Sequence, residues 1–138
     1  MTQTFSGRCL CGAVRYSSSA EPAMAGHCHC EDCRRSSGSG HSSHLAVPEA
    51  SVSLAGKTKG YARAADSGNV VTRHFCPECG AALYSTNAGM PGMMFLRASS
   101  LDDLEIFKPQ MHVFTARAAS WDRRDGELPA FDKMPPGM

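Results

Sequence analysis

The chain has 138 residues and an almost even charge balance, with 14 lysine or arginine side chains against 13 aspartate or glutamate side chains. This balance excludes the strongly basic character that nucleic acids and anionic membranes select, so we expect neither as a partner. No apolar run approaches the roughly 20 residues that cross a bilayer, and the first residues do not resemble a secretory signal. We therefore expect a single domain spanning residues 1–138, located in the reducing cytoplasm.

Short strand-like segments separated by turns make up most of the chain. Alternating apolar and polar residues, or runs of β-branched and aromatic residues, predict strands at 13–16, 24–28, 44–47, 51–54, 70–75, 81–84, 93–96 and 112–114, with another beginning at Tyr61. Pro48 separates the strands on either side of it, because proline cannot occupy a central strand. These segments predict a mostly β fold.

Two short helical turns and an irregular tail complete the predicted elements. One turn is expected at 34–37, and another at 99–104, capped by Ser99 or Ser100. The tail from residue 119 onward is expected to be irregular, with its apolar side chains packed on the sheet. These side chains are Trp121, Leu128, Phe131 and Met134.

Seven cysteines fall into three tight groups. The groups are Cys9 with Cys11, the triplet Cys28, Cys30 and Cys33, and Cys76 with Cys79. An odd number of cysteines cannot all pair as disulfides, and a reducing compartment keeps thiols free. Two pairs and a triplet divide without remainder into one four-thiolate site and one three-thiolate site. We therefore favour metal binding over a disulfide framework. A thioredoxin-like role is also disfavoured, because neither Cys-x-x-Cys pair is predicted to open a helix within a β–α–β unit.

Cys76 and Cys79 lie between two predicted strands, which is the arrangement of a zinc-ribbon knuckle. The proline between them restricts the turn, and Gly80 can adopt a positive φ just past the second ligand. This knuckle offers half of a tetrahedron, and Cys9 with Cys11 offers the other half. Pairing Cys76 and Cys79 with two members of the triplet is the alternative, but it leaves Cys9 and Cys11 without a role.

The triplet Cys28, Cys30 and Cys33 lies within six residues, so its thiolates repel one another unless a cation binds them. A zinc ion takes all three as tetrahedral ligands and keeps one position free, which is the pattern of catalytic sites. That position would bind a thiol, which the zinc deprotonates, or a water molecule. The alternative is a closed structural site with a fourth ligand from His27, His29, His41, His44, His74, His112, Glu31 or Asp32.

Arg34 and Arg35 directly follow the triplet. A zinc ion with three thiolates carries a net negative charge, so these side chains would offset that charge or hold an anionic substrate. A solvated basic turn is the alternative interpretation.

Three ordered motifs extend through the chain: Gly7-x-Cys9-x-Cys11-Gly12, then Cys28-His29-Cys30-x-x-Cys33-Arg34, then Cys76-x-x-Cys79-Gly80. Together they resemble the glutathione-dependent formaldehyde-activating enzyme (GFA) family, which also includes centromere protein V. The resemblance spans nearly the whole chain, including Trp121-Asp122 near its end.

The resemblance implies a β-tent fold of small antiparallel sheets around zinc, as in small zinc-containing Rab exchange factors. It implies two zinc ions per chain. A structural zinc would be held by Cys9, Cys11, Cys76 and Cys79, and a catalytic or glutathione-displaceable zinc by Cys28, Cys30 and Cys33. The family reaction adds glutathione to formaldehyde and gives S-hydroxymethylglutathione, which classes the enzyme as a carbon–sulfur lyase in the reverse sense.

Two functions of different classes remain open from the sequence. The first is a zinc-dependent carbon–sulfur lyase that acts on a thiol–aldehyde adduct, with a small thiol such as glutathione and an aldehyde as partners. The second is a non-catalytic zinc-binding module for protein interaction. Replacing Cys33 separates them, because an enzyme should lose turnover while staying folded, whereas a structural module should lose stability.

Overall fold

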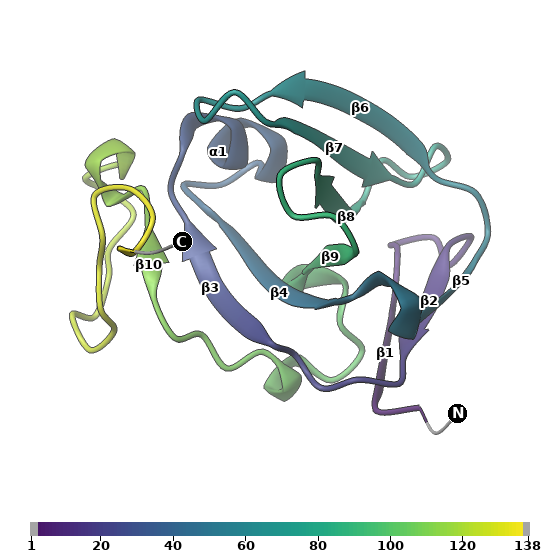
Figure 1. Ribbon diagram of the computed structural model, residues 1–138. Coiled ribbons are helices and arrows are strands. Elements are labelled where there is room, and N and C mark those ends of the chain that lie inside the picture. The colour runs from purple at the N-terminus through teal and green to yellow at the C-terminus, as the bar shows by residue number, and fades with distance from the viewer. Residues whose placement is uncertain (1–2, 137–138) are drawn as a thin grey trace.

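Ten strands form two sheets in the computed structural model, which describes residues 3–136 (Figure 1). The smaller sheet has the order β1-β2-β5, with β1 Phe5–Arg8, β2 Arg15–Ser18 and β5 Val52–Ala55. The larger sheet has the order β10-β3-β4-β9-β8-β7-β6. Its strands are β3 Met24–Cys28, β4 Ser42–Pro48, β6 Lys59–Ala64, β7 Val70–Phe75, β8 Ala82–Asn87, β9 Met93–Arg97 and β10 His112–Val113.

The helical elements within residues 3–136 are short. The α-helix α1 spans Glu31–Ser37, and single 3₁₀ turns occupy Glu49–Ser51, Ala98–Ser100, Leu104–Ile106 and Thr115–Arg117. None of the helices in this described part is long and apolar enough to cross a membrane.

The prediction of a mostly β fold is confirmed, and each predicted strand overlaps an observed one. Strand β4 ends at Pro48, as predicted. The sequence did not reveal β1, because serine and glycine contribute little strand preference. That strand forms through its antiparallel pairing with β2, which places Gly7 opposite Tyr16. A side chain at Gly7 would overlap the Tyr16 ring, so glycine permits this close approach.

Helix α1 begins three residues before the predicted turn because Cys30 caps it. The Cys30 sulfur accepts a hydrogen bond from the backbone N–H of Cys33 at 3.3 Å. The helix ends at Gly38, whose φ of 74° suits a left-handed C-terminal residue. Cysteine is not among the residues that commonly cap helices, so Cys30 did not indicate where the helix begins. Its spacing from Cys28 and Cys33 indicated metal binding instead.

The predicted capping of a 99–104 turn by Ser99 or Ser100 is wrong. Two separate 3₁₀ turns, Ala98–Ser100 and Leu104–Ile106, overlap the two ends of this segment instead, and Asp103 caps the second by accepting a hydrogen bond from the N–H of Glu105. The Ser100 hydroxyl is used elsewhere, since it pairs with the buried Tyr16 hydroxyl at 2.6 Å.

One buried cluster joins the two sheets. Its fully buried members include Val14, Leu45, Val47, Leu83 and Leu96. Phe5 and Tyr16 contribute from the smaller sheet, and Cys9 and Cys76 also belong to the cluster. The contact between the sheets therefore includes two of the predicted zinc ligands.

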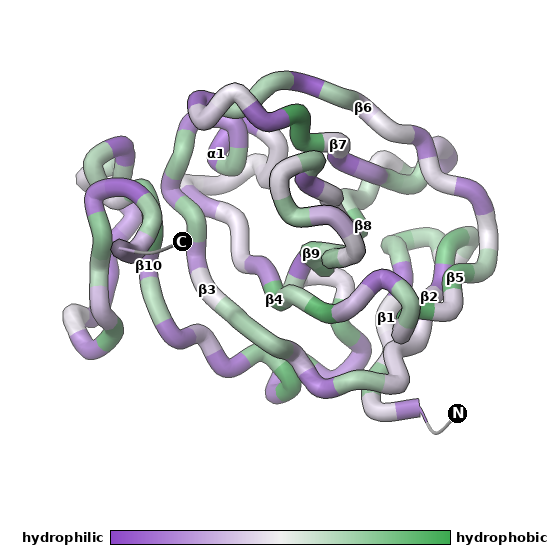
Figure 2. The backbone as a smooth tube through the Cα atoms, viewed as in Figure 1, coloured by the Kyte–Doolittle hydropathy of each residue, from purple (hydrophilic) through white to green (hydrophobic). Residues whose placement is uncertain are grey.

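The C-terminal tail lies beside β10 at the left of Figure 1. Strand β10 pairs in parallel with β3, the only parallel pair among the named strands. The tail follows on its other side, where the N–H of Phe131 donates to the carbonyl of His112 at 2.9 Å. Figure 2 shows hydrophobic and hydrophilic residues interleaved along this tail. The prediction that Trp121 packs on the sheet is wrong, because that side chain is 68% exposed and backbone bonds hold the tail instead.

Candidate metal centres and the adjoining cavity

The sulfur atoms of the two distant cysteine pairs meet at one point. Cys9 and Cys11 follow β1, and Cys76 and Cys79 occupy the turn between β7 and β8. The four Sγ atoms lie within 4.8 Å of one another. The separation is 3.7 Å between Cys9 and Cys11 and 3.8 Å between Cys11 and Cys76. Neighbouring sulfurs on a tetrahedral zinc ion are about 3.8 Å apart when each Zn–S bond is about 2.3 Å, so this group fits a closed metal site.

Backbone geometry around the four-cysteine group favours ionised sulfur. The N–H of Val14 donates to Cys9 Sγ at 3.3 Å, and the N–H of Glu78 donates to Cys76 Sγ at 3.4 Å. Hydrogen bonds to a thiolate stabilise its charged form, which is the form that binds metal.

The turns that carry these ligands depend on glycine. Gly12 and Gly80 have φ values of 82° and 77°, which residues with side chains rarely adopt. Hydrogen bonds from backbone N–H groups lower the pKa of Cys79 to about 6, with the largest effect from Ala81, the residue after Gly80, and the next largest from Cys11. The knuckle therefore presents a thiol that ionises near neutral pH.

Cys28, Cys30 and Cys33 form a second, separate group. Cys28 ends β3, Cys30 is the N-cap of α1, and Cys33 lies in the first turn of that helix. Their Sγ atoms lie within 4.8 Å of one another, and no histidine or carboxylate from residues 3–136 belongs to the group. Hydrogen bonding among the three sulfurs raises the pKa of Cys28 and lowers that of Cys33. All three can carry charge together only when a cation neutralises them.

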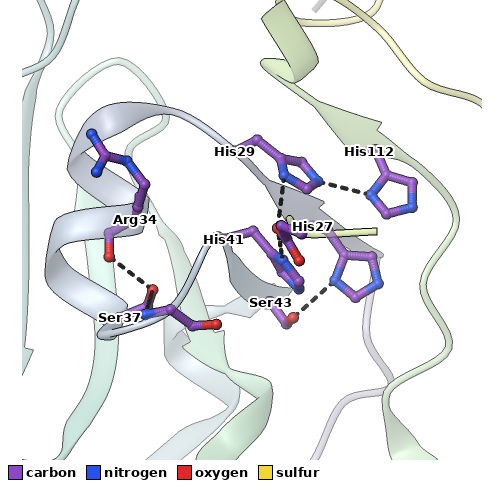
Figure 3. Close-up of polar contacts among 9 residues, drawn as sticks. His27, His29, Arg34, Ser37, His41, Ser43 and His112 are labelled. Atoms are coloured by element: carbon purple, nitrogen blue, oxygen red, sulfur yellow. Dashed lines mark hydrogen bonds and ion pairs between the residues drawn. The ribbon is translucent and has the colours of Figure 1, made fainter. Parts of the chain in front are cut away.

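His44 is a candidate fourth ligand that contacts the triplet. Its Nε2 atom lies 3.7 Å from Cys33 Sγ, but the same nitrogen also bonds to the Ser42 hydroxyl. His29, which sits between two of the cysteines, turns its ring away, with Nε2 lying 3.0 Å from Nδ1 of His112 (Figure 3). The group that fits a metal ion thus has three protein donors.

Arg97 at the end of β9 is a buried cation beside the triplet. Its side chain is 4% exposed and donates to the Ser36 hydroxyl of α1 at 3.0 Å. Burial lowers the pKa of Arg97, and the nearby sulfurs of Cys33, Cys28 and Cys30 act in the opposite direction. A guanidinium in this place offsets the negative charge of three thiolates.

The two arginines that follow the triplet in sequence are placed differently. Arg35 is 68% exposed and lies 3.8 Å from Glu31, one helical turn earlier. Neither Arg34 nor Arg35 belongs to the wall of the cavity beside the triplet. Arg35 therefore has the position of a solvated helix residue, whereas Arg97 lies where its charge can offset the negative charge of the three thiolates.

A cavity of about 450 Å³ adjoins the triplet, and all three cysteines form part of its wall. Its other walls come from β3, β4, the β6–β7 hairpin and the segment after β10. In Figure 1 this hairpin reaches over α1, and Arg63 of β6 lies 3.6 Å from Asp32 of α1. Apolar side chains make up much of the wall; they include Met24, Val71, Phe95, Met111 and Val113.

Three arginines also line the cavity, namely Arg63, Arg73 and Arg117. Arg117 lies 3.7 Å from Asp66, and Arg63 lies 3.6 Å from Asp32, so both have carboxylate neighbours. Arg73 is half-buried, and no carboxylate within residues 3–136 pairs with it. An apolar cavity with one uncommitted arginine can hold a small molecule that carries a carboxylate.

A family model described as glutathione-dependent formaldehyde-activating enzyme matches residues 4–117. The chain belongs to this family. A crystal structure of a Rhodobacter sphaeroides protein, a structural-genomics target, has a similar fold, with a TM-score of 0.59 and 20% sequence identity. That likeness covers 91% of this chain and 98% of the other chain. No curated protein matches the chain.

Membership of the GFA family associates the chain with enzyme chemistry of glutathione and formaldehyde. The matched region contains all seven cysteines and the three cavity arginines. It ends before Asp122, a carboxylate in the tail that lies within 2.6 Å of a histidine ring nitrogen.

Sequence reasoning found the cysteine groups but assigned no role to Arg73 or Arg97, and it noted Asp122 only as part of the family resemblance. The cysteines are close in sequence or sit in recognisable turns, so their spacing carries information. The other three reach the site only through strand pairing and tail packing. Their positions in the sequence offered no local signal.

Proposed function

We propose that the chain is a zinc-dependent enzyme that makes or breaks the carbon–sulfur bond of a thiol–aldehyde adduct. The reference reaction is the addition of glutathione to formaldehyde, and a related small thiol or aldehyde is the closest variant. The observation that carries the proposal is the triplet of cysteines in the wall of a cavity, with no fourth histidine or carboxylate in the group from residues 3–136. A reducing cytoplasm, which keeps thiols free, suits this chemistry.

The two cysteine groups would divide the work. Cys9, Cys11, Cys76 and Cys79 would hold a structural zinc, since four sulfurs complete a tetrahedron. Cys28, Cys30 and Cys33 would hold the second zinc, which would supply Lewis acidity that favours ionisation of a thiol. The buried guanidinium of Arg97 would offset the negative charge of these three thiolates.

The cavity residues would orient the reactants. The thiol sulfur lies at the triplet end, and a carboxylate of the thiol compound pairs with Arg73. The apolar wall excludes water and holds the aldehyde carbon against the sulfur. The sulfur electron pair forms the carbon–sulfur bond, the carbonyl π pair moves to oxygen, and the proton released by the thiol ends on that oxygen. The reverse sequence cleaves the adduct.

The alternative, a non-catalytic zinc module, requires no cavity beside an incomplete ligand set. Four sulfurs would already satisfy its structural need. The cavity with its arginine lining therefore favours the enzyme.

The test uses protein in which cobalt replaces zinc, because cobalt–thiolate absorption reports each change in the ligands. Millimolar glutathione should alter the part of the spectrum that Cys33→Ser abolishes. Purified zinc protein should also accelerate exchange between formaldehyde and S-hydroxymethylglutathione, measured by NMR, and C33S should lose this activity while keeping its circular dichroism spectrum. A spectrum that ignores glutathione and other small thiols would contradict the proposal.

A further inference from the structure

A third cluster of metal-ligating side chains lies next to the triplet and is separate from both cysteine groups. It consists of His29, His41 and Asp122. His29 follows β3, His41 precedes β4, and Asp122 comes from the C-terminal tail, so the cluster joins three segments of the chain. Neither the proposed zinc sites nor the proposed reaction uses these residues.

The donor atoms of this cluster converge. Nδ1 of His41 lies 2.6 Å from Oδ2 of Asp122, and Nδ1 of His29 lies 3.3 Å from the same oxygen. One ligand atom from each of the three residues lies within 4.8 Å of the other two. Ligand atoms on a tetrahedral zinc ion with bonds of about 2.1 Å are about 3.4 Å apart. The His29–Asp122 separation already has this value, and the His41–Asp122 pair needs to widen by less than about 1 Å.

The His29 ring carries a second, independent indication of a ligand. This side chain is fully buried, and its Nδ1 atom has no hydrogen-bond partner within residues 3–136, although Oδ2 of Asp122 lies 3.3 Å away. Its other nitrogen, Nε2, lies 3.0 Å from Nδ1 of His112 (Figure 3). When Nε2–H donates to His112, Nδ1 presents a buried lone pair to the cluster. A metal-bound histidine commonly donates its second ring N–H to a neighbour in this way.

The surrounding backbone leaves room for the carboxylate. Gly40 is buried beside His41, and a Cβ atom at Gly40 would lie 2.6 Å from Oδ2 of Asp122. The glycine therefore admits the Asp122 side chain to the cluster. Asp122 is itself mostly covered, with a side-chain exposure of 13%.

We infer that His29, His41 and Asp122 form a third metal site, which takes a divalent first-row transition ion such as Zn²⁺ through two imidazoles and one carboxylate. This donor set lacks sulfur, so it is chemically distinct from the cysteine groups. The bound ion connects the tail to the loop between Cys28 and Cys30, since His29 lies in that loop. The inference does not depend on the proposed enzymatic activity.

The test is an anaerobic titration of the full chain with Co²⁺, followed by absorption spectroscopy and equilibrium dialysis with elemental analysis. Cysteine-bound cobalt produces intense thiolate charge-transfer absorption. The wild type should bind one further equivalent after that absorption saturates, with weak d–d bands and no added charge transfer. Because saturation is read from the spectrum, this result is distinguishable whether one or both cysteine groups bind metal.

Asp122→Asn and His41→Gln should each lower the affinity for this last equivalent of Co²⁺ by roughly 100-fold or more, since even changes outside the ligand shell lower metal affinity 10–100-fold. Asp132→Asn, an exposed aspartate in the same tail, is the matched control and should leave it unchanged. Absence of the non-thiolate equivalent from the wild type would overturn the inference and leave a hydrogen-bonded clamp. Equal binding by D122N and H41Q would overturn it as well.

Discussion

The four-cysteine group joins segments that are 65 residues apart, whereas the three-cysteine group is contained in a single stretch of six residues. Cys9 and Cys76 of the first group belong to the buried core. The second group forms part of a cavity wall instead. Under the proposed function, a metal ion at the first group would be enclosed by four sulfurs next to the core, whereas one at the second group would be accessible from the cavity.

Replacing one ligand in each group gives the largest predicted contrast. Cys76→Ser should destabilise the fold by several kcal/mol or prevent folding, because structural zinc contributes on the order of 10–16 kcal/mol in small zinc domains. Cys33→Ser should leave the chain folded. Thermal denaturation and zinc content of the two variants check this prediction. A C76S protein as stable as C33S would contradict the assigned roles.

Removing the buried cation should weaken metal binding at the triplet alone. Arg97→Met should lower the zinc affinity of the three-cysteine group by about 10–100-fold, as loss of outer-shell partners does elsewhere. Competition with a chromophoric chelator measures how many zinc ions become labile. Arg35→Met, on the exposed face of α1, is the control and should behave like the wild type. If R97M loosens both ions equally, the effect is general destabilisation.

The cavity arginine provides a smaller, substrate-specific contrast. Arg73→Met should raise KM for glutathione about 10-fold with a smaller change in kcat, because a charge-assisted hydrogen bond contributes about 1.5 kcal/mol. Steady-state kinetics with glutathione and with a small thiol that lacks carboxylates separate the two cases. Only the glutathione reaction should respond. An equal loss with both thiols would place Arg73 outside substrate binding.

We expect the smallest effect on stability from a change at the contact between the smaller sheet and the rest of the protein. Tyr16→Phe removes the hydroxyl that bonds to Ser100 at 2.6 Å and should cost about 1 kcal/mol of stability at neutral pH. Burial raises the pKa of Tyr16 to about 12, so the folded state keeps this proton more firmly than the unfolded chain.

The direction of the Tyr16 pKa shift determines how stability depends on pH. The contribution of Tyr16 to the free energy of unfolding is fully present below about pH 10 and declines as the pH rises towards about 12. Urea denaturation of wild type and Y16F across this range checks it, with the difference between the two proteins isolating Tyr16 from other groups. A difference that stays constant with pH would contradict the assignment. The triplet should bind thiols alike in both proteins.

Local patterns in the sequence were sufficient for much of the fold. The run Val70–Phe75 is β-branched and aromatic, and the structure contains β7 over the same residues. Gly80 adopts the positive φ that its place after a Cys-x-x-Cys turn predicted. These features depend on a few consecutive residues, whose steric preferences are present in the chain before it folds.

Local sequence patterns did not predict the placement of Trp121, and the reason is physical. Trp121 was expected to pack on the sheet because a large aromatic side chain usually gains by burial. The tail is held instead by backbone hydrogen bonds to β10 and by Asp122, which leaves the indole exposed. Hydrophobicity alone does not determine which side of a tail faces the protein.

The sequence by itself determined which cysteines group together and which turns carry them, because ligand spacing and glycine conformation are local properties. Only the tertiary structure decided that one group borders the core and the other a cavity. Pairing of β4 with β9 places Arg97 beside the triplet, and docking of the tail places Asp122 against His29 and His41. These neighbours are tens of residues apart in the chain, so their interactions arise only when the sheet and tail assemble.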